Sequence, residues 1–177
     1  MGPDQATLRR VFSKELQNRA VGLLATQQLQ IDRAGLPDGV FWRAYAALEA
    51  FNRCVYAPYA QRYELTVDAT ATSKVAAKAA RLLFRLSSKH YGKMLADGAR
   101  RHTERLKPLV DLSPAMDRAF FLYVVEQERV QILANEKVRL SDFKGASDVL
   151  RDVVKRHAAA GFHDCASNLG QKTEAEP

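Results

Sequence analysis

Residues 4–39 read DQATLRRVFSKELQNRAVGLLATQQLQIDRAGLPDG, and they decide the expected fold. Asp4 is a suitable N-cap, and after it apolar residues recur at steps of three and four, which is the spacing of one face of an α-helix. They are Leu8, Val11, Phe12, Leu16, Ala20, Leu23 and Leu24. The run GLPDG at 35–39 combines the residue types of a tight turn. The stretch therefore predicts one long amphipathic helix over residues 4–34, followed by a reversal of the chain.

The rest of the chain repeats this helical spacing. It predicts further helices over residues 41–65, 73–105, 113–139 and 147–161. Pro58 lacks a backbone donor, so we expect a kink or a restart there. Gly92 is expected to bend the helix over 73–105, because glycine is a weak helix former.

Capping residues support the later boundaries. Ser113 followed by Pro114 is a suitable pair to start a helix. Ser147 is a suitable N-cap for the last helix, and Gly161 a suitable residue to end it. The helix over 73–105 is expected to bury one apolar face, made of Val75, Ala79, Leu82, Leu83 and Leu86.

No segment alternates strictly between apolar and polar residues with turn signals at its ends, as a half-buried strand would. The sequence therefore predicts an all-α, single-domain bundle of five or six helices with short connections. The chain has 177 residues, which suits one domain. We assign residues 1–161 to the helical domain and residues 162–177 to a loosely ordered C-terminal tail.

The cellular location of the protein and the redox state of its two cysteines are predicted from sequence signals that are absent. The N-terminus lacks the apolar segment of a signal peptide, and no apolar run is long enough for a transmembrane segment. Cys54 and Cys165 lie far apart in the sequence and form no CxxC pattern. We therefore expect reduced thiols and a cytoplasmic protein.

Positive charge is concentrated in the middle of the chain. The whole sequence carries a net charge of +7. Residues 73–107 contain ten basic and two acidic residues, whereas residues 1–72 have a net charge of +1 and residues 108–177 one of −2. An excess of this kind attracts nucleic acid, anionic lipid or an acidic protein.

Six of these cations follow one another at helical steps: Lys74, Lys78, Arg81, Arg85, Lys89 and Lys93. On one helix they would form a stripe beside the apolar face, able to follow a phosphate backbone. Arg100, Arg101, Arg105 and Lys107 extend the positive field. We predict a non-enzymatic protein that binds a polyanion, DNA or RNA, through this stripe. The alternative is an ordinary solvated helix face whose cations pair with the acidic last third of the chain.

A second surface suggests a different class of function. Five Tyr and Arg residues gather over 53–63, namely Arg53, Tyr56, Tyr59, Arg62 and Tyr63. These residue types are enriched at the centres of protein interfaces. The alternative prediction is therefore a protein-interaction module, such as an adaptor, a chaperone or a toxin-neutralising partner, that binds an acidic protein. Binding to an anionic membrane surface would need an apolar face that the bundle is expected to use for its own core.

Sequence motifs of catalysis are absent. A di-iron bundle needs Glu-x-x-His on two helices, yet Glu15, Glu49 and Glu128 are followed at the third position by Asn18, Asn52 and Gln131. His90, His102, His157 and His163 form no zinc motif, and the group His157, His163, Asp164 and Cys165 is interpreted as incidental. No phosphate loop, dinucleotide fingerprint or nucleophile elbow occurs. We predict no enzyme, no metal and no cofactor, and the sequence makes no prediction of oligomeric state.

Overall fold

The computed structural model describes residues 3–84, 87–162 and 165, and in those ranges it contains helices and no strand. The α-helices are α1 (Pro3–Asp32), α2 (Gly39–Arg62), α3 (Ala71–Leu83), α4 (Ser88–Asp111), α5 (Arg118–Arg139) and α6 (Phe143–Ala159), with a 3-10 turn η1 (Ala115–Asp117) before α5. The predicted all-α, single-domain bundle with short connections is confirmed.

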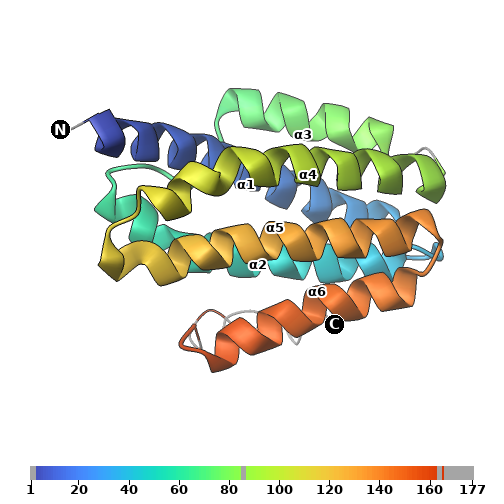
Figure 1. Cartoon of the computed structure of the whole chain (residues 1–177). Helices are drawn as coiled ribbons and strands as arrows, with labels where there is room; N and C mark the ends of the chain where they lie inside the picture. The colour runs from blue at the N-terminus through green and yellow to red at the C-terminus, as the bar shows by residue number, and fades with distance from the viewer. Residues whose placement is uncertain (1–2, 85–86, 163–164, 166–177) are drawn as a thin grey trace.

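Four long helices, α1, α2, α4 and α5, form the bundle, and the two shorter helices lie on its outside (Figure 1). The first long helix packs against α2 and α4, and α4 packs along α5. Across the centre, α2 and α5 are joined by hydrogen bonds, such as the one that Tyr45 Oη donates to Gln131 Oε1 at 2.6 Å. Outside the bundle, α3 packs on α1, and α6 packs on α2 and α5.

The predicted turn after α1 is present, and Asp38 holds it. Arg33, at the start of the turn, forms an ion pair with Asp38 at 2.8 Å. The buried Asp38 carboxylate also accepts hydrogen bonds from Trp42 Nε1 and Tyr91 Oη, at 3.0 and 2.7 Å. Gly39 is required next to it, because a Cβ there would lie 2.3 Å from the carbonyl oxygen of Arg33. The reversal between α1 and α2 is thereby tied to α4.

The apolar core consists of two clusters placed along the bundle. One is centred on aromatic residues of α1, α2 and α5, including Phe12, Phe51, Tyr56, Phe120 and Phe121. The other joins α2 to α4, α5 and α6, and includes Phe41, Trp42, Tyr91, Val138 and Leu150. The core therefore has two apolar ends.

The predicted helix over 73–105 is in fact two helices. The first, α3, ends at Leu83, and α4 begins at Ser88. Buried Phe84 follows α3 directly and packs on Trp42 and Tyr91, so the chain turns where this ring enters the core.

The prediction that the apolar residues of α3 are buried is also wrong. Val75 and Leu82 are 68% and 62% exposed, and Leu83 is exposed as well, while Leu86 lies outside the described residues. The helix instead turns Ser73 and Ala77 inward. Small side chains let α3 lie close to α1, and the larger apolar ones are left facing solvent.

The helix is continuous at both single residues where a kink, a restart or a bend was expected. Helix α2 continues through Pro58 to Arg62, so the predicted restart is absent. Gly92 lies inside α4, where a Cβ would be 2.7 Å from the backbone nitrogen of Arg139. This glycine therefore allows close packing of α4 against α5, and α4 is not interrupted there.

The last two helices begin at other residues than predicted. Ser113 donates to the carbonyl oxygen of Val110, and α5 starts after the η1 turn, with Asp117 at its N-cap. Helix α6 starts at Phe143 because Asp142 accepts a hydrogen bond from Gly145 N, and Ser147 is buried inside the helix. Gly161 has a φ of +127° just after α6, which confirms the predicted terminating glycine.

The expectation of reduced thiols is contradicted, because Cys54 and Cys165 form a disulfide. Their Cα atoms lie 5.5 Å apart although 111 positions separate them in the sequence. Cys165 is buried where the chain after α6 returns to α2, and Phe162 packs there on Phe51. Disulfides persist mainly in oxidising compartments, so the thiols no longer support the prediction of a cytoplasmic location.

Among the described residues, no helix has the length and apolar character that crossing a membrane requires. Of the predicted tail, residues 163–164 and 166–177 lie outside the described residues.

Candidate functional site

The predicted basic stripe is divided between two helices. Lys74, Lys78 and Arg81 are on α3, and Lys89 and Lys93 are on α4, with the chain turning between them. Arg85 lies outside the described residues. The prediction of one continuous row on one helix is therefore wrong, although the cations remain on two helices that are consecutive in the chain.

Acidic neighbours neutralise some of these cations. Arg81 forms an ion pair with Asp32 of α1. Asp97 pairs with Lys93 at 2.7 Å and with Arg100 at 2.9 Å, and Arg100 also pairs with Glu136. Of these partners only Glu136 belongs to the acidic last third of the chain, so the predicted pairing with that third is present for Arg100, while Asp32 and Asp97 come from other parts of the chain.

Other cations of this region have no such neighbour. The exposed side chains of Lys74, Lys78, Lys89 and Arg101 form no hydrogen bond or ion pair with another described residue. The same holds for three further cations, Arg10 and Lys14 on α1 and Arg105 on α4. Unpaired cations are thus present on each of three helices, α1, α3 and α4.

Arg10, Lys14 and Arg105 line one pocket of about 640 Å³. Its wall includes hydroxyl groups from the start of α3, those of Thr70, Thr72 and Ser73. Our sequence analysis did not single out Arg10 and Lys14. Their i,i+4 spacing on the polar side of the first helix was the available signal, but it did not show that α4 would place Arg105 opposite them.

The Tyr and Arg residues of α2 are mainly structural. Tyr56 and Tyr63 are buried, and their hydroxyls donate to Glu15 and Asp117 at 2.9 and 2.8 Å. Tyr59 stacks on Phe120, with ring centroids 3.7 Å apart. Two of the three tyrosines therefore belong to the core, which corrects their assignment to a partner surface.

The two arginines of that surface are exposed but paired. Arg53 forms an ion pair with Asp68 at 3.2 Å, and Arg62 pairs with buried Asp117. The surface over 53–63 is thus smaller and less charged than the sequence predicted.

A layer of buried polar residues separates the two apolar clusters of the core. Each of the four bundle helices contributes to it. The layer comprises Glu15 and Arg19 of α1, Glu49 and Asn52 of α2, His102 of α4, and Gln127, Glu128 and Gln131 of α5. All of these side chains are buried except His102, which is partly exposed.

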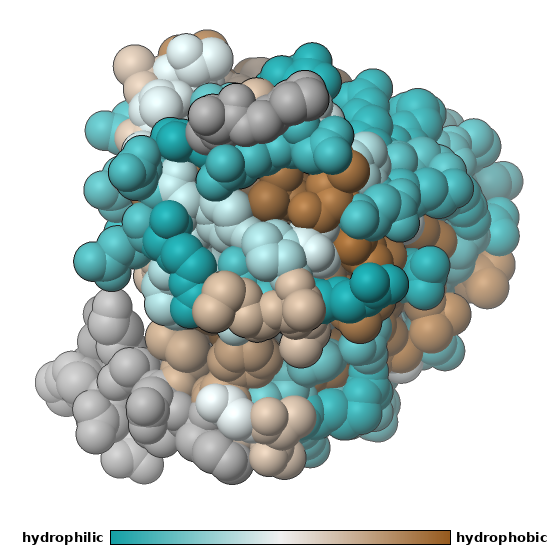
Figure 2. Space-filling model, turned by 60° about the vertical axis from the view of Figure 1, so that its left-hand side comes forward, coloured by the Kyte–Doolittle hydropathy of each residue, from teal (hydrophilic) through white to brown (hydrophobic). Residues whose placement is uncertain are grey.

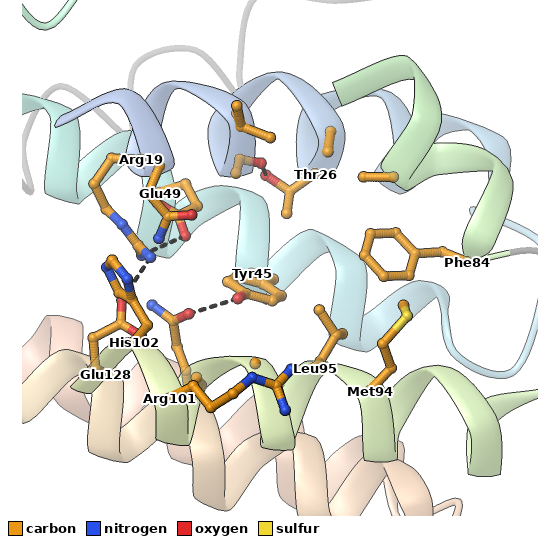
Figure 3. A pocket seen from close by; sticks show the side chains of 18 of the residues that line it. Arg19, Thr26, Tyr45, Glu49, Phe84, Met94, Leu95, Arg101, His102 and Glu128 are labelled. Carbon is orange, nitrogen blue, oxygen red and sulfur yellow. Dashed lines mark hydrogen bonds and ion pairs between the residues drawn. The ribbon is translucent and has the colours of Figure 1, made fainter. Parts of the chain in front are cut away.

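Arg19 lies at the centre of this polar layer. Its guanidinium group contacts Glu15 at 3.1 Å, Glu49 at 2.8 Å and Glu128 at 2.5 Å. These carboxylates come from three helices, so a single cation connects α1, α2 and α5. Figure 3 shows Arg19 with Glu49 and Glu128. A buried charge is tolerated in a protein core only when it is paired in this way.

The remaining members are joined by hydrogen bonds. His102 Nε2 and Glu15 Oε2 lie 2.5 Å apart, which connects α4 to α1. Asn52 donates to Gln127 Oε1 at 3.3 Å and accepts a hydrogen bond from Tyr123. The polar layer thus has partners from every bundle helix.

The surroundings change the acidity of these groups. Burial raises the pKa of Glu49 to about 7, and the nearby Arg19 only partly opposes this. Burial also raises the pKa of Glu128. Burial disfavours the charged forms of Glu15 and His102. At Glu15 the positive charge of Arg19, followed by the contact with His102, outweighs burial, and at His102 the contact with Glu15 does so. The pKa of Glu15 is therefore lowered and that of His102 raised.

A pocket of about 370 Å³ reaches this polar layer from the side of α1 and α4. Arg19, Glu49, His102 and Glu128 lie at one end of it, and Phe84, Met94 and Leu95 at the other (Figure 3). The exposed Arg101 and Arg105 also line it. A pocket of this size with one polar and one apolar end is suited to a small molecule.

Sequence reasoning missed the polar layer, although one signal was present. Glu15 and Arg19 fall within the apolar face of the first helix, between Val11 and Phe12 in angular position. Charged residues on an apolar helix face indicate a buried ion pair or a ligand-binding site in the core. Their partners on α2, α4 and α5 could not be identified without the packing of the helices.

Glu15, His102 and Glu128 also have the side-chain atoms required to hold a metal ion, and these atoms lie within 4.8 Å of one another. No family model matches the chain, and no match was found among curated proteins or solved structures.

Proposed function

We propose that this protein binds a polyanion, DNA or RNA, with the unpaired cations of α1, α3 and α4. The observation that carries the proposal is the pocket lined by Arg10, Lys14 and Arg105. These side chains come from two helices, are exposed, and form no ion pair with another described residue. Cations that are already neutralised by carboxylates contribute less to such binding.

The cations of α3 and α4 extend this surface. Lys74, Lys78, Lys89 and Arg101 are exposed and unpaired among the described residues. Contacts between cations and phosphates position a nucleic acid without reading its sequence, so we expect weak sequence preference. Each neutralised phosphate releases counterions, so affinity should fall with salt.

The test is a titration of labelled duplex and single-stranded nucleic acid at two salt concentrations about fourfold apart. The variant carries Arg10→Glu, Lys14→Glu and Arg105→Glu. Loss of three phosphate contacts should reduce the slope of log affinity against log salt by about 3 and weaken binding at low salt.

The matched control carries Arg118→Glu, Arg129→Glu and Lys155→Glu on α5 and α6. These cations are also exposed and unpaired among the described residues, so the change in net charge is the same. Equal weakening by both variants would mean that only net charge matters, and no binding by the unmodified protein would reject the proposal.

A second candidate is an anionic membrane surface, and the observation that favours it is the exposed apolar side of α3. Val75, Leu82 and Leu83 face solvent on the same helix as the unpaired Lys74 and Lys78. Figure 2 shows that apolar residues form separate patches on a mainly hydrophilic face of the molecule. An apolar side bordered by lysines is typical of helices that lie on anionic lipid.

Vesicle sedimentation separates the two candidates. Leu82→Ser with Leu83→Ser should abolish binding to anionic vesicles and leave nucleic-acid binding unchanged if lipid is the ligand of α3. Retention of vesicle binding by this variant would reject the membrane candidate.

A further inference from the structure

Three helices of the bundle bring together a set of groups that the sequence keeps far apart. Glu15 is on α1, His102 on α4 and Glu128 on α5, and their oxygen and nitrogen atoms lie within 4.8 Å of one another. Carboxylate and imidazole are ligands of zinc and of first-row transition metals such as manganese and iron. The set therefore combines one imidazole nitrogen with carboxylate oxygens, which a cluster of acidic residues alone would not offer.

The charge of the polar layer is unbalanced in favour of a cation. Glu15, Glu49 and Glu128 supply three carboxylates, whereas Arg19 supplies one permanent positive charge. A metal ion binds ionised carboxylates and a neutral imidazole, and binding displaces the protons that these groups hold without it. In that protonation state Arg19 alone would leave two of the three negative charges unbalanced in a buried place. Uncompensated buried charge is strongly unfavourable, and a divalent cation would balance it.

Glu128 provides a second and independent observation. Its side chain is only 2% exposed. Oε1 accepts hydrogen bonds from Arg19 and Gln127, at 2.5 and 2.9 Å, while Oε2 has no hydrogen-bond partner among the described residues. Oε2 is not one of the fully buried side-chain atoms that lack a partner, so it keeps some access to solvent, and its free acceptor capacity is available to a ligand that enters through the pocket.

The pocket gives an entry path. His102 and Glu128 both line the pocket of about 370 Å³, so an ion can reach them from solvent. Three protein ligands beside an open pocket leave further coordination positions for water or for a small molecule.

We propose that Glu15, His102 and Glu128 bind one divalent transition-metal ion, of the class of Zn²⁺, Mn²⁺ or Fe²⁺. The ion replaces the hydrogen bond between His102 and Glu15, and Arg19 stays paired with Glu49. None of its three ligands is one of the cations of the proposed polyanion surface, although His102 and Arg105 line both pockets.

The first test uses the whole protein after treatment with a chelator. Zn²⁺ and Mn²⁺ are titrated by calorimetry, Fe²⁺ without oxygen, and Co²⁺ by its visible absorption, which reports the ligands directly. We expect one ion per chain and a Co²⁺ spectrum of nitrogen and oxygen coordination. Absence of saturable binding of all four metals would overturn the proposal and leave Arg19 and protons as the only counter-charges.

Two variants locate the ion. His102→Ala and Glu128→Gln should each weaken binding by at least tenfold, since loss of even an outer partner of a metal ligand costs about 10–100-fold. His102 is partly exposed and at the pocket wall, so its variant is expected to fold even if the change at Glu128, which contacts Arg19, disturbs folding. Circular dichroism and thermal melting check this.

The matched control is another histidine and glutamate in contact. His157 Nε2 and Glu126 Oε2 lie 3.0 Å apart, on α6 and α5. His157→Ala and Glu126→Gln should leave metal affinity unchanged. Binding that survives His102→Ala, or that is lost equally in the control variants, would contradict the assigned site.

Discussion

Asp38 shows how one buried carboxylate connects three parts of the chain. It accepts hydrogen bonds from Arg33 in the turn, Trp42 in α2 and Tyr91 in α4. Burial alone would raise its pKa, but these donors outweigh burial and lower it. A carboxylate with a lowered pKa stabilises the folded state above its unfolded pKa, and this contribution is lost as the pH falls through the folded pKa.

We therefore expect Asp38→Asn to lower the melting temperature at neutral pH, because the neutral amide cannot replace the charge-assisted bonds to Arg33 and Tyr91. The loss should be of the order of 1–3 kcal/mol, the usual cost of breaking such a group. Thermal melts of the protein and the variant from pH 7 to pH 3 check this. A difference that stays constant to pH 3 would show that ionisation of Asp38 has no part in it.

Glu49 should produce the opposite dependence on pH. Burial raises its pKa in the folded protein to about 7, from an ordinary value of 4.5. Between these two pKa values the folded state holds a proton on Glu49 that the unfolded state releases. The contribution of Glu49 to the free energy of unfolding is therefore greatest below pH 4.5 and falls as the pH rises to about 7. A shift of this size corresponds to roughly 3 kcal/mol.

Glu49→Gln should remove this fall, since the amide keeps the shape and has no proton to lose. Denaturant unfolding of chelator-treated protein and variant between pH 5 and pH 8 measures it. The two stability curves should converge at low pH and separate towards pH 8, with the variant the more stable. Parallel curves would mean that Glu49 is ionised throughout, with Arg19 as its full counter-charge.

At the scale of helices, two glycines of α4 should respond in opposite ways to the same change. A Cβ at Gly92 would lie 2.7 Å from the backbone nitrogen of Arg139, whereas one at Gly98 would meet no atom within 4 Å. Both are inside α4. The contrast separates intrinsic helix propensity from the packing of α4 against α5.

We expect Gly92→Ala to destabilise the fold by about 1–3 kcal/mol, because backbone must move to accept the methyl group. Gly98→Ala should stabilise it by up to about 1 kcal/mol, through helix propensity alone. Chemical denaturation of the two variants gives both values. If Gly92→Ala were as stable as Gly98→Ala, the close approach of α4 and α5 would be refuted.

At the scale of the whole molecule, the disulfide between Cys54 and Cys165 ties the start of the predicted C-terminal tail to α2. A bond that closes so long a loop restricts the unfolded chain, and its removal typically costs about 2–5 kcal/mol. We expect a reductant, or Cys54→Ser with Cys165→Ser, to lower the melting temperature.

Mass spectrometry after alkylation, with and without reductant, shows whether the bond forms. The unmodified protein should take up alkylating agent only after reduction. Two free thiols in protein prepared under oxidising conditions would restore the original expectation of reduced cysteines and contradict the pairing.

The sequence by itself determined the fold class and most of the helices. Helix formation depends on neighbours three and four positions apart, so the apolar steps of residues 8–24 and the turn at 35–39 were sufficient for α1 and its reversal. Gly161 was identified as a helix end for the same local reason. Boundaries failed where a distant contact decided them, as with Phe84, whose ring enters the core and divides the predicted third helix.

Only the tertiary structure decided the site. The polar layer, the pairing of Cys54 with Cys165 and the pocket of Arg10, Lys14 and Arg105 join residues of separate helices. No pattern along the chain shows which helices become neighbours or how each one is rotated about its axis. That rotation buried Tyr56 and Tyr63, exposed Val75 and Leu82, and turned Glu15, His102 and Glu128 towards one another, because packing of the whole bundle, and not local spacing, sets it.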